Sequence, residues 1–254
     1  MSETVLLSGN EAVARGLWEA GGRFAAAYPG TPSTEILENA ATYEAITSTW
    51  ATNEKTAFEM ATGASIAGAR SLCAMKHVGL NVAADPLMSF AYAGVNGGFL
   101  VVTADDPGMH SSQNEQDNRW YAIFGKIPVL EPSDSQEAKD FVAMGFDISE
   151  TFDTPVMLRL TTRISHSKTR VALGPRRDVP LRDYKKNPSK NLLMPHNARV
   201  RHALIESERM PRLREFSETS GVNRIEWGGR ELGIISASVA YQYAREVFPD
   251  ASHL

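Results

Sequence analysis

Short apolar runs alternate with longer segments of helical periodicity from the start of the chain to about Thr162, and this alternation constrains the fold more than any other feature. The runs predict six strands: Arg23–Tyr28, Ile46–Thr49, Ser71–Met75, Phe99–Ala104, Ile127–Leu130 and Val156–Leu160. The helical segments are Glu11–Ala20, Ser33–Tyr43, Lys55–Ala69, Val82–Ala93, Glu115–Phe124 and Ser135–Glu150. Strand–helix units in this order predict an α/β domain, doubly wound around a mostly parallel sheet.

The sequence changes character after Ser167. From Lys168 to Arg230 it holds 15 Lys and Arg against 7 Asp and Glu, whereas the remainder has 11 against 23. The same stretch carries five prolines, so we expect a basic, extended connection wrapped over the first domain, with one helix near Ala198–Arg209. Its basic face could meet a partner or an acidic ligand, but a solvated linker is the more ordinary interpretation.

A further strand at Glu231–Ser236 and a helix at Val239–Phe248 follow this connection. One such unit cannot make a sheet by itself, so we expect the start of a second α/β domain in a fragment of a longer polypeptide. The alternative is that this strand joins the first sheet. The predicted parts are an α/β domain over 1–167, a connection over 168–230 and the first element of a second domain over 231–254.

Composition and missing motifs exclude several classes of function. The net charge of −4 gives the whole molecule no bias toward nucleic acid or an anionic membrane. With Cys73 as the single cysteine, this chain alone cannot build an intrachain disulfide, a tetrathiolate zinc site or an iron–sulfur cluster. A basic signal-peptide region and a long apolar run are absent, so we expect a cytoplasmic location. A P-loop, a Gly-x-Ser-x-Gly elbow and a His-Glu-x-x-His helix are also missing.

Polar residues gather in four stretches at the expected carboxyl ends of strands, where open parallel sheets bind ligands. In the first, Thr31 can present its hydroxyl and nearby amides at a helix N-terminus, a place for a carboxylate or phosphate, although a capping turn also fits. In the second, Glu54 opens a helix so rich in Ala and Gly that a cofactor or another backbone can come close. On local evidence alone, Glu54 complements the helix dipole.

The third stretch is a loop over Lys76–Asn81, with a cation, an imidazole and a glycine, although a lone histidine is more often structural. The fourth, Asp105–Arg119, is too long to be only a turn and suits a binding loop or a plain surface loop. Asp105 and Asp106 could ligate Mg²⁺, but adjacent carboxylates are weak evidence, so we assign no metal to this chain.

Taken together, four motifs resemble the thiamine diphosphate-dependent 2-oxoacid:ferredoxin oxidoreductases, and within them the N-terminal part of the indolepyruvate ferredoxin oxidoreductase alpha subunit. The motifs are Tyr28–Ser33, Asn53–Lys55, Met75–Met88 and Asp106–Asp117. The resemblance covers about Leu6 to Ser167, and Glu231 to Leu254 resembles the opening of that family's next domain. It implies the thiamine diphosphate-binding fold, with this chain as a pyrimidine-type domain.

The resemblance also implies roles for particular residues. Glu54 matches the glutamate that hydrogen-bonds N1′ of the aminopyrimidine ring and favours the tautomer that deprotonates the thiazolium C2. We therefore expect Glu54 in a cleft lined by small or apolar groups. Thr31 matches a threonine that contacts the 2-oxoacid. Further residues expected at the cofactor are Val78, Gly79 and Leu80. Residues expected to line the substrate pocket are His77, Asn81, His110 and Gln113.

The implied reaction is oxidative decarboxylation of a 2-oxoacid, such as indolepyruvate or another arylpyruvate, to an acyl-CoA with ferredoxin as electron acceptor. The implied partners are coenzyme A, ferredoxin and a beta subunit, together with a second copy of this chain through the small-residue helix. Two alternatives stay open: a thiamine-dependent decarboxylase or synthase without ferredoxin, and a non-catalytic partner-binding subunit.

Two departures from the family pattern limit these implications. The sequence lacks the Gly-Asp-Gly and downstream Asn pattern that binds Mg²⁺ and the diphosphate, and it lacks the cysteine motifs of the iron–sulfur clusters. We therefore expect both groups to be bound outside this chain. The chain alone should hold half of the cofactor cleft, bind thiamine diphosphate weakly or not at all, and be inactive.

Overall fold

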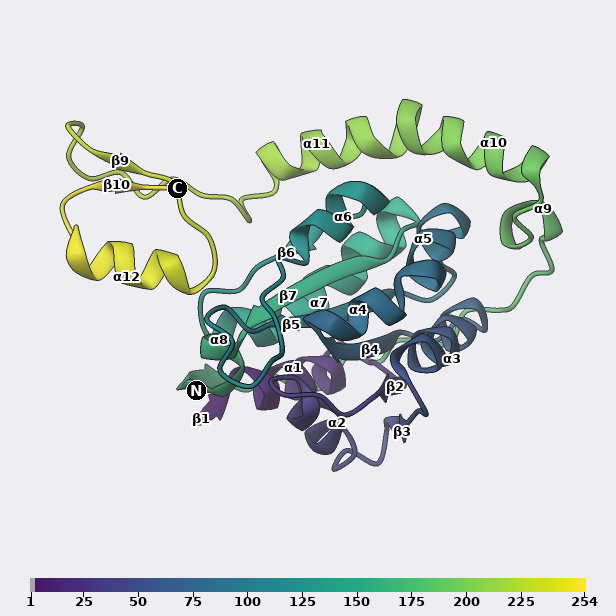
Figure 1. Cartoon of the computed structure of the whole chain (residues 1–254), viewed down its shortest axis with the longest axis horizontal. Helices are drawn as coiled ribbons and strands as arrows, with labels where there is room; N and C mark the ends of the chain where they lie inside the picture. The colour runs from purple at the N-terminus through teal and green to yellow at the C-terminus, as the bar shows by residue number, and fades with distance from the viewer. Residues whose placement is uncertain (1–2) are drawn as a thin grey trace.

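The computed structural model describes residues 3–254 and contains a six-stranded parallel sheet in the order β3-β2-β4-β5-β7-β6 (Figure 1). The strands are β2 (Phe24–Ala27), β3 (Thr47–Trp50), β4 (Ser71–Lys76), β5 (Phe99–Asp105), β6 (Val129–Leu130) and β7 (Val156–Thr161). Each matches one of the six predicted strands, and every pairing between them is parallel. The prediction of a doubly wound α/β domain is confirmed.

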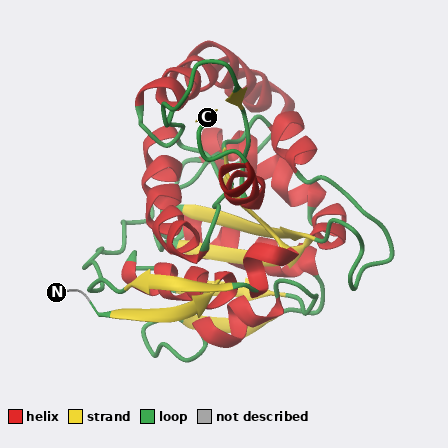
Figure 2. Ribbon diagram, turned by 90° about the vertical axis from the view of Figure 1, so that its left-hand side faces the viewer, coloured by secondary structure: helices red, strands yellow, loops and turns green. Residues whose placement is uncertain are grey.

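Helices cover both faces of this sheet (Figure 2). One apolar core contains side chains from α1 (Gly9–Glu19), α2 (Thr34–Ala40) and α7 (Ser135–Phe152). The other contains side chains from α3 (Glu54–Ile66), α4 (His77–Val82), α5 (Ala84–Ala93) and α6 (Arg119–Gly125). Successive strand residues point to opposite faces, so Leu72 and Ala74 enter the first core while Cys73 and Met75 enter the second.

Several of these helices begin at a polar capping residue. Ser8 and Glu11 form a capping box at α1, and the Asn53 side chain accepts a hydrogen bond of 2.9 Å from the Thr56 amide at α3. Asp134 caps α7 in the same way. Capping satisfies backbone N–H groups that have no partner within the helix, so these residues determine where each helix starts.

Two predicted segments between β4 and β6 differ from the structure. In place of the loop expected over Lys76–Asn81, Lys76 ends β4 and α4 begins at His77, and the helix expected over Val82–Ala93 begins only at Ala84. The expected helix Glu115–Phe124 begins at Arg119, because side-chain hydrogen bonds described below hold the preceding residues in a loop. In both cases contacts between separate segments override the local pattern.

An antiparallel pair of strands that the sequence pattern did not predict lies beside the first domain. β1 (Thr4–Ser8) pairs with β8 (Lys168–Ala172), which follows the short helix α8 (Thr162–His166). Val171 is fully buried in the first core. The pairing crosses the predicted boundary between residues 167 and 168 and joins the beginning of the connection to the α/β domain.

The connection contains more helix than predicted. After an extended stretch come α9 (Pro188–Asn191), α10 (Pro195–Leu204), a π-helical turn (Ile205–Arg209) and α11 (Met210–Thr219). The last three form one continuous helix across the first domain (Figure 1). The predicted helix Ala198–Arg209 therefore lies within a longer one.

Basic side chains of this connection bind backbone carbonyls at the ends of helices. Arg176 donates to the Trp18 and Gly22 carbonyl oxygens at 2.6 and 3.0 Å, beyond α1. Arg201 and Arg209 bind carbonyls near the ends of α5 and α7. Each of these helices ends just before a strand begins, so their carbonyl ends share the amino edge of the sheet. The connection is therefore a basic strap, held to this edge by these three arginines, while most of its other basic side chains are exposed to solvent.

The last segment forms a small separate lobe. β9 (Gly233–Ile234) pairs in parallel with β10 (Ser252–His253), and α12 (Val239–Val247) lies between them in the chain (Figure 1). The predicted strand and helix are both present here, and the strand does not join the first sheet. Among residues 3–254, no helix combines the length and apolar character needed to cross a bilayer.

Replacing Arg209 tests the strap. Its buried guanidinium donates to the Ala91 and Phe152 carbonyl oxygens at 2.6 and 3.1 Å and also to the Asp153 carbonyl. Burial lowers the pKa of Arg209 to about 10, so the group stays charged at neutral pH. Arg209→Met leaves these carbonyls without donors and should lower the free energy of unfolding by about 3 kcal/mol in urea denaturation. Arg199→Met, at an exposed position of α10, is the control and should change it by less than ~0.5 kcal/mol. If both variants lowered the free energy of unfolding by the same amount, the conclusion that Arg209 holds the strap to this edge would be contradicted.

Candidate functional site

The four polar stretches lie at the carboxyl edge of the sheet, as parallel strands require. Thr31 follows β2, Glu54 follows β3, Lys76 ends β4 and Asp105 ends β5. These four strands are consecutive neighbours in the sheet, so the stretches lie side by side at one edge. The basic strap binds the opposite edge and leaves this one uncovered.

Glu54 is the first residue of α3, and 9% of it is exposed. Its carboxylate packs against α4 at Gly79, where a Cβ atom would lie only 2.6 Å from Glu54 Oε1. Glycine at position 79 is therefore required for this contact. Across residues 3–254 the Glu54 carboxylate has no hydrogen bond or ion pair with another side chain or backbone group.

A thiol lies in the core close to this carboxylate. Cys73, in β4, is fully buried, and burial together with the nearby charge of Glu54 raises the pKa of its thiol. The thiol therefore stays protonated at neutral pH and behaves as an apolar core group. Gly79 and Cys73 are thus a small and an apolar neighbour of Glu54, while the cleft expected around it stays a prediction.

His77 connects α4 to the polar loop that follows β5. Its ring is fully buried, and Nε2 lies 2.9 Å from the Asn114 carbonyl oxygen. Its own carbonyl accepts a hydrogen bond of 3.4 Å from the Asn118 side chain. A buried ring in this place orients the loop and does not reach the pocket surface, where the sequence analysis expected it.

Asp105 and Asp106 are engaged within the protein. Asp105 pairs with Arg159 at 2.7 Å and accepts from the Asn118 amide at 3.1 Å, while burial raises the pKa of Asp105 against the influence of Arg159. Asp106 accepts from the Ser111 amide at 2.8 Å and from the Thr162 hydroxyl at 2.7 Å. In the described part of the chain, no group of three or more His, Cys, Asp or Glu could hold a metal ion.

The other predicted residues are spread along the same edge. Thr31, Asn81 and Gln113 are exposed, and the Asn81 side chain accepts a hydrogen bond of 2.6 Å from the Tyr121 hydroxyl. Val78 is half-buried beside Gly79, whereas Leu80 is fully buried in the second core. The structure therefore leaves Thr31, Val78, Asn81 and Gln113 accessible and places Leu80 among core side chains.

His110 lies at a different cavity. This cavity of about 430 Å³ lies between α8 and the C-terminal lobe, and His110 shares it with residues of both. Its polar lining includes Arg163, His166 and Tyr243. Neither Glu54 nor Thr31 lines this cavity, so the structure does not group His110 with them there.

Lys76 is a residue of this edge that the sequence analysis left without a role. Its side chain crosses Gly30, where a Cβ atom would lie 2.9 Å from Lys76 Cδ. Its ammonium then reaches 3.4 Å from the Ser111 carbonyl oxygen. Lys76 lies at the end of a predicted strand and inside one of the four motifs, and this position could have identified it as a candidate site residue.

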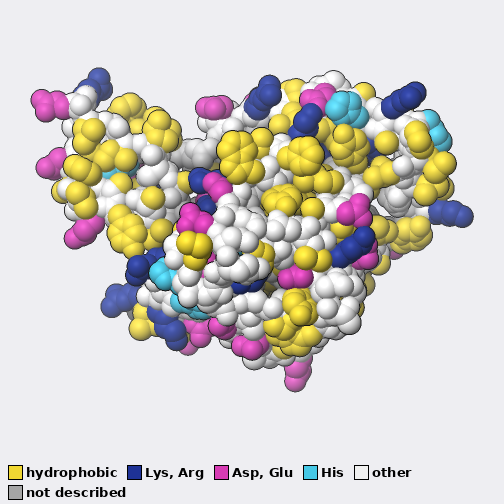
Figure 3. Space-filling model, in the orientation of Figure 1, with side chains coloured by type: hydrophobic (Ala, Val, Ile, Leu, Met, Phe, Trp, Pro, Cys, Tyr) yellow, Lys and Arg dark blue, Asp and Glu magenta, His cyan; other side chains and the backbone are white. Residues whose placement is uncertain are grey.

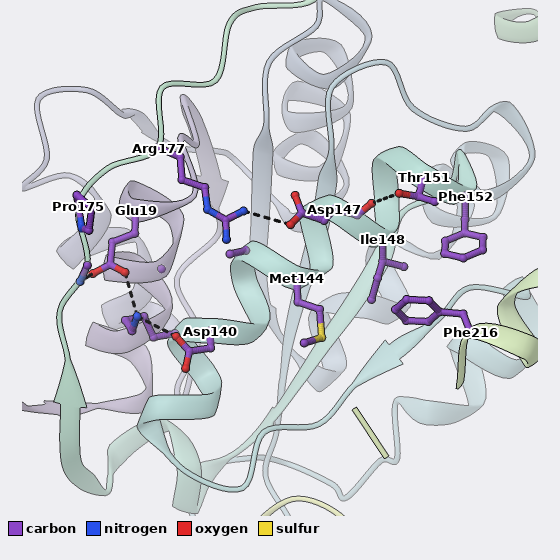
Figure 4. A pocket seen from close by; sticks show the side chains of 14 residues that line it. Glu19, Asp140, Met144, Asp147, Ile148, Thr151, Phe152, Pro175, Arg177 and Phe216 are labelled. Atoms are coloured by element: carbon purple, nitrogen blue, oxygen red, sulfur yellow. Dashed lines mark hydrogen bonds and ion pairs between the residues drawn. The ribbon is translucent and has the colours of Figure 1, made fainter. Parts of the chain in front are cut away.

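A larger hollow of about 680 Å³ lies elsewhere, between α1, α7 and the strap (Figure 4). Arg177 extends toward Asp147 here and pairs with it at 3.1 Å, and the buried Lys139 pairs with Glu19 at 2.9 Å. None of the predicted site residues lines this hollow. It is a gap between strap and helices, apart from the candidate site.

This fold, with polar residues gathered at the carboxyl edge of a parallel sheet, defines a ligand-binding α/β domain. Residues 15–218 match the family described as pyruvate flavodoxin/ferredoxin oxidoreductase, thiamine diphosphate-binding. The chain belongs to this family, in agreement with the resemblance stated from the sequence.

Several curated relatives support the assignment. Indolepyruvate oxidoreductase subunit IorA of Archaeoglobus fulgidus is 46% identical over 253 residues, which is 96% of this chain and 40% of the relative. IorA of Pyrococcus horikoshii is 46% identical over 257 residues, covering 96% and 39%. 2-Oxoglutarate synthase subunit KorA of Methanothermobacter thermautotrophicus is 30% identical over 188 residues, covering 69% and 49%. The chain thus spans about two fifths of the length of the IorA relatives.

A solved structure has the same fold. It is described as 2-oxoglutarate:ferredoxin oxidoreductase from Magnetococcus marinus with 2-oxoglutarate, coenzyme A and succinyl-CoA bound. The TM-score is 0.79 at 18% identity, over 99% of this chain and 53% of the other. At this identity the likeness establishes the fold alone.

The hydrogen bonds of Asp106 predict a pH dependence. Burial of Asp106 opposes ionisation, but the hydrogen bonds from the Ser111 amide and the Thr162 hydroxyl outweigh it and hold the pKa of Asp106 below its usual range. A carboxylate with a lowered folded-state pKa stabilises the fold above the unfolded pKa of about 4 and loses this effect as pH falls.

Asp106→Asn should therefore lower the free energy of unfolding by about 1–2 kcal/mol at pH 7, and by progressively less as the pH falls below about 4. Denaturant titrations at pH 7 and pH 3 measure the two values. Glu38→Gln removes an exposed carboxylate from α2 and is the matched control, expected to show little effect at either pH. If Asp106→Asn lowered the free energy of unfolding equally at both pH values, the lowered pKa of Asp106 would be contradicted.

Proposed function

We propose that this chain supplies the aminopyrimidine-binding half of the cofactor site in a thiamine diphosphate-dependent oxidoreductase. Its substrates are indolepyruvate and other arylpyruvates, which the enzyme oxidatively decarboxylates to acyl-CoA with ferredoxin as acceptor. The contact between Glu54 and Gly79 carries this proposal. The IorA relatives, named as indolepyruvate oxidoreductase subunits at 44–46% identity, support the choice of substrate.

The residues at this edge fit the pyrimidine ring. Glu54 is a mostly buried carboxylate that has no partner among residues 3–254, and Gly79 leaves open the space that a Cβ would fill. A ring nitrogen of the cofactor is a suitable partner, because buried polar groups are nearly always hydrogen-bonded. Val78 and Gly79, in the first turn of α4, would contact the ring, and the buried Leu80 would support this turn from the core.

Glu54 would share a proton with N1′ of the pyrimidine ring, and its burial keeps water out of that hydrogen bond. When bound, thiamine diphosphate would supply a thiazolium ring, with a nucleophilic carbon and a cationic sink for the electron pair released in decarboxylation. Thr31, exposed in the loop after β2, would bind the carboxylate or carbonyl of the 2-oxoacid. Asn81 and Gln113 would line the entrance, with His77 orienting the loop from behind.

An exposed apolar face beside the site supports its completion by another domain or chain. In α6, Trp120, Ile123 and Phe124 are 69%, 65% and 76% exposed, and Figure 3 shows apolar side chains gathered over this region. The neighbouring Tyr121 donates to Asn81 and so joins this face to the site. Apolar patches of this kind mark interaction surfaces.

The remaining components would come from outside this chain. We place the diphosphate, its Mg²⁺, the iron–sulfur clusters and a beta subunit there, in a cytoplasmic enzyme. A homodimer through α3 is part of the proposal, since a Cβ on Gly63 would meet no atom within 4 Å and a second backbone could approach closely.

Calorimetry with thiamine diphosphate and Mg²⁺ tests the half-site. The isolated chain should bind the cofactor weakly or not at all and should not decarboxylate indolepyruvate, because half of the cleft is missing. The polypeptide extended through the length of its IorA relatives should bind and, with its beta subunit, reduce ferredoxin. Robust turnover by the isolated chain would refute the half-site, and turnover without ferredoxin reduction would favour the decarboxylase or synthase.

Replacing Glu54 tests the catalytic assignment in the extended form. Glu54→Gln should weaken cofactor binding about tenfold and lower kcat by at least about a hundredfold, because the amide cannot share a proton with the ring in the same way. Glu59→Gln, which neutralises an exposed acid on the same helix, is the matched control and should leave both quantities near those of the wild type. If the two variants behaved alike, Glu54 would not be the catalytic acid–base residue.

A further inference from the structure

We propose that the Lys76 ammonium binds the carboxylate of the 2-oxoacid substrate. This inference rests on the proposed function and adds a specificity-determining residue to it. Lys76 ends β4 in an extended backbone conformation and immediately precedes α4. Three residues later Gly79 contacts Glu54, so the lysine and the glutamate belong to the same edge of the sheet.

The side chain of Lys76 lies against the loop that carries Thr31. A Cβ atom on Gly30 would lie 2.9 Å from Lys76 Cδ and 3.1 Å from Cγ, so the methylene groups cross directly over this glycine. Any other residue at position 30 would displace the lysine. The stem of Lys76 is thus held in one direction, from β4 across the loop after β2 toward the loop after β5.

The ammonium of Lys76 has unused hydrogen-bonding capacity. Its one hydrogen bond within residues 3–254 is to the Ser111 carbonyl oxygen at 3.4 Å, which is long for a charged donor. An ammonium carries three donors, and no carboxylate of the described residues lies within 4.0 Å of this one. Two donors remain for a ligand.

Two other cations of this edge, Lys55 and Arg159, already have carboxylate partners. Lys55 pairs with Asp85 at 3.0 Å and Arg159 pairs with Asp105 at 2.7 Å. The Asp106 carboxylate, in the same loop as Ser111, binds that loop's backbone and Thr162 instead of Lys76. Lys76 is therefore a cation of the site whose charge the described protein groups do not neutralise.

The charge of the proposed substrate suits such a cation. A 2-oxoacid brings a negative carboxylate into an edge that already holds the mostly buried carboxylate of Glu54. Like charges at short range repel in a partly desolvated site, and a positive group between them offsets this repulsion. An ammonium beside Thr31 would bind the acid in preference to an uncharged aldehyde or alcohol of the same shape.

The test measures substrate and analogue binding in the extended enzyme with its beta subunit. Lys76→Gln should raise the KM for indolepyruvate and the Kd for 3-indolepropionate by about tenfold or more. The Kd for thiamine diphosphate should stay within about twofold of the wild type, and Lys76→Arg should restore most of the carboxylate affinity. Lys55→Gln removes an equivalent charge that is already paired and is the matched control.

An uncharged analogue and a second variant separate a charge effect from a structural one. Lys76→Gln should leave the affinity for 3-indolepropanol unchanged, because that alcohol lacks the carboxylate. Gly30→Ala should also weaken 3-indolepropionate binding, and the double variant should be no weaker than Lys76→Gln alone, since both changes remove the same interaction.

The outcomes distinguish this inference from the proposed function. A wild-type enzyme that binds thiamine diphosphate but whose carboxylate affinity is insensitive to Lys76→Gln would overturn the inference alone. Equal weakening of 3-indolepropionate, 3-indolepropanol and the cofactor would assign Lys76 a structural role and also overturn it. Failure of the wild type to bind either the cofactor or 3-indolepropionate would overturn both.

Discussion

The rest of the structure depends on the partial negative charge at one edge of the parallel sheet. Four helices end just before a strand begins and bring their carbonyl ends to this edge: α1, α3, α5 and α7. The chain meets it with a positively charged segment. Arg176, Arg201 and Arg209 donate to carbonyl oxygens there, and Lys190 donates to the Val95 carbonyl at 2.7 Å. The segregation of charge along the sequence thus has a structural cause.

Because the strap binds the amino edge, the carboxyl edge is left for a ligand. There the first residue of α3 and the last residue of β4 provide opposite charges, Glu54 and Lys76, and two glycines allow their side chains to take these positions. Gly79 makes room for the carboxylate and Gly30 for the lysine stem. The buried ring of His77 and the carboxylate of Asp106 then hold the polar loop beside them.

Features governed by local periodicity were predictable. All six strands of the main sheet and most of its helices follow from patterns of a few residues, and the family motifs located Glu54 and Thr31. Features governed by distant contacts were not. The β1–β8 pair joins the two ends of the first domain, and Arg209 binds a carbonyl 118 residues away. Pro211 is one of the five prolines from which an extended chain was expected, yet the preceding π-helical turn, with the Met210 amide bonded to the Ile205 carbonyl, lets the helix continue.

The sequence by itself determined the class of fold and the motif residues that gather at the carboxyl edge of the sheet, because alternating patterns and loop signals act over short distances. Only the tertiary structure decided which of those residues are buried, accessible or without a partner among the described residues. It buried His77 and Leu80, left Glu54 without a protein partner and directed Lys76 across Gly30. Such outcomes depend on packing between elements far apart in the chain, and a pattern read along one segment does not contain that information.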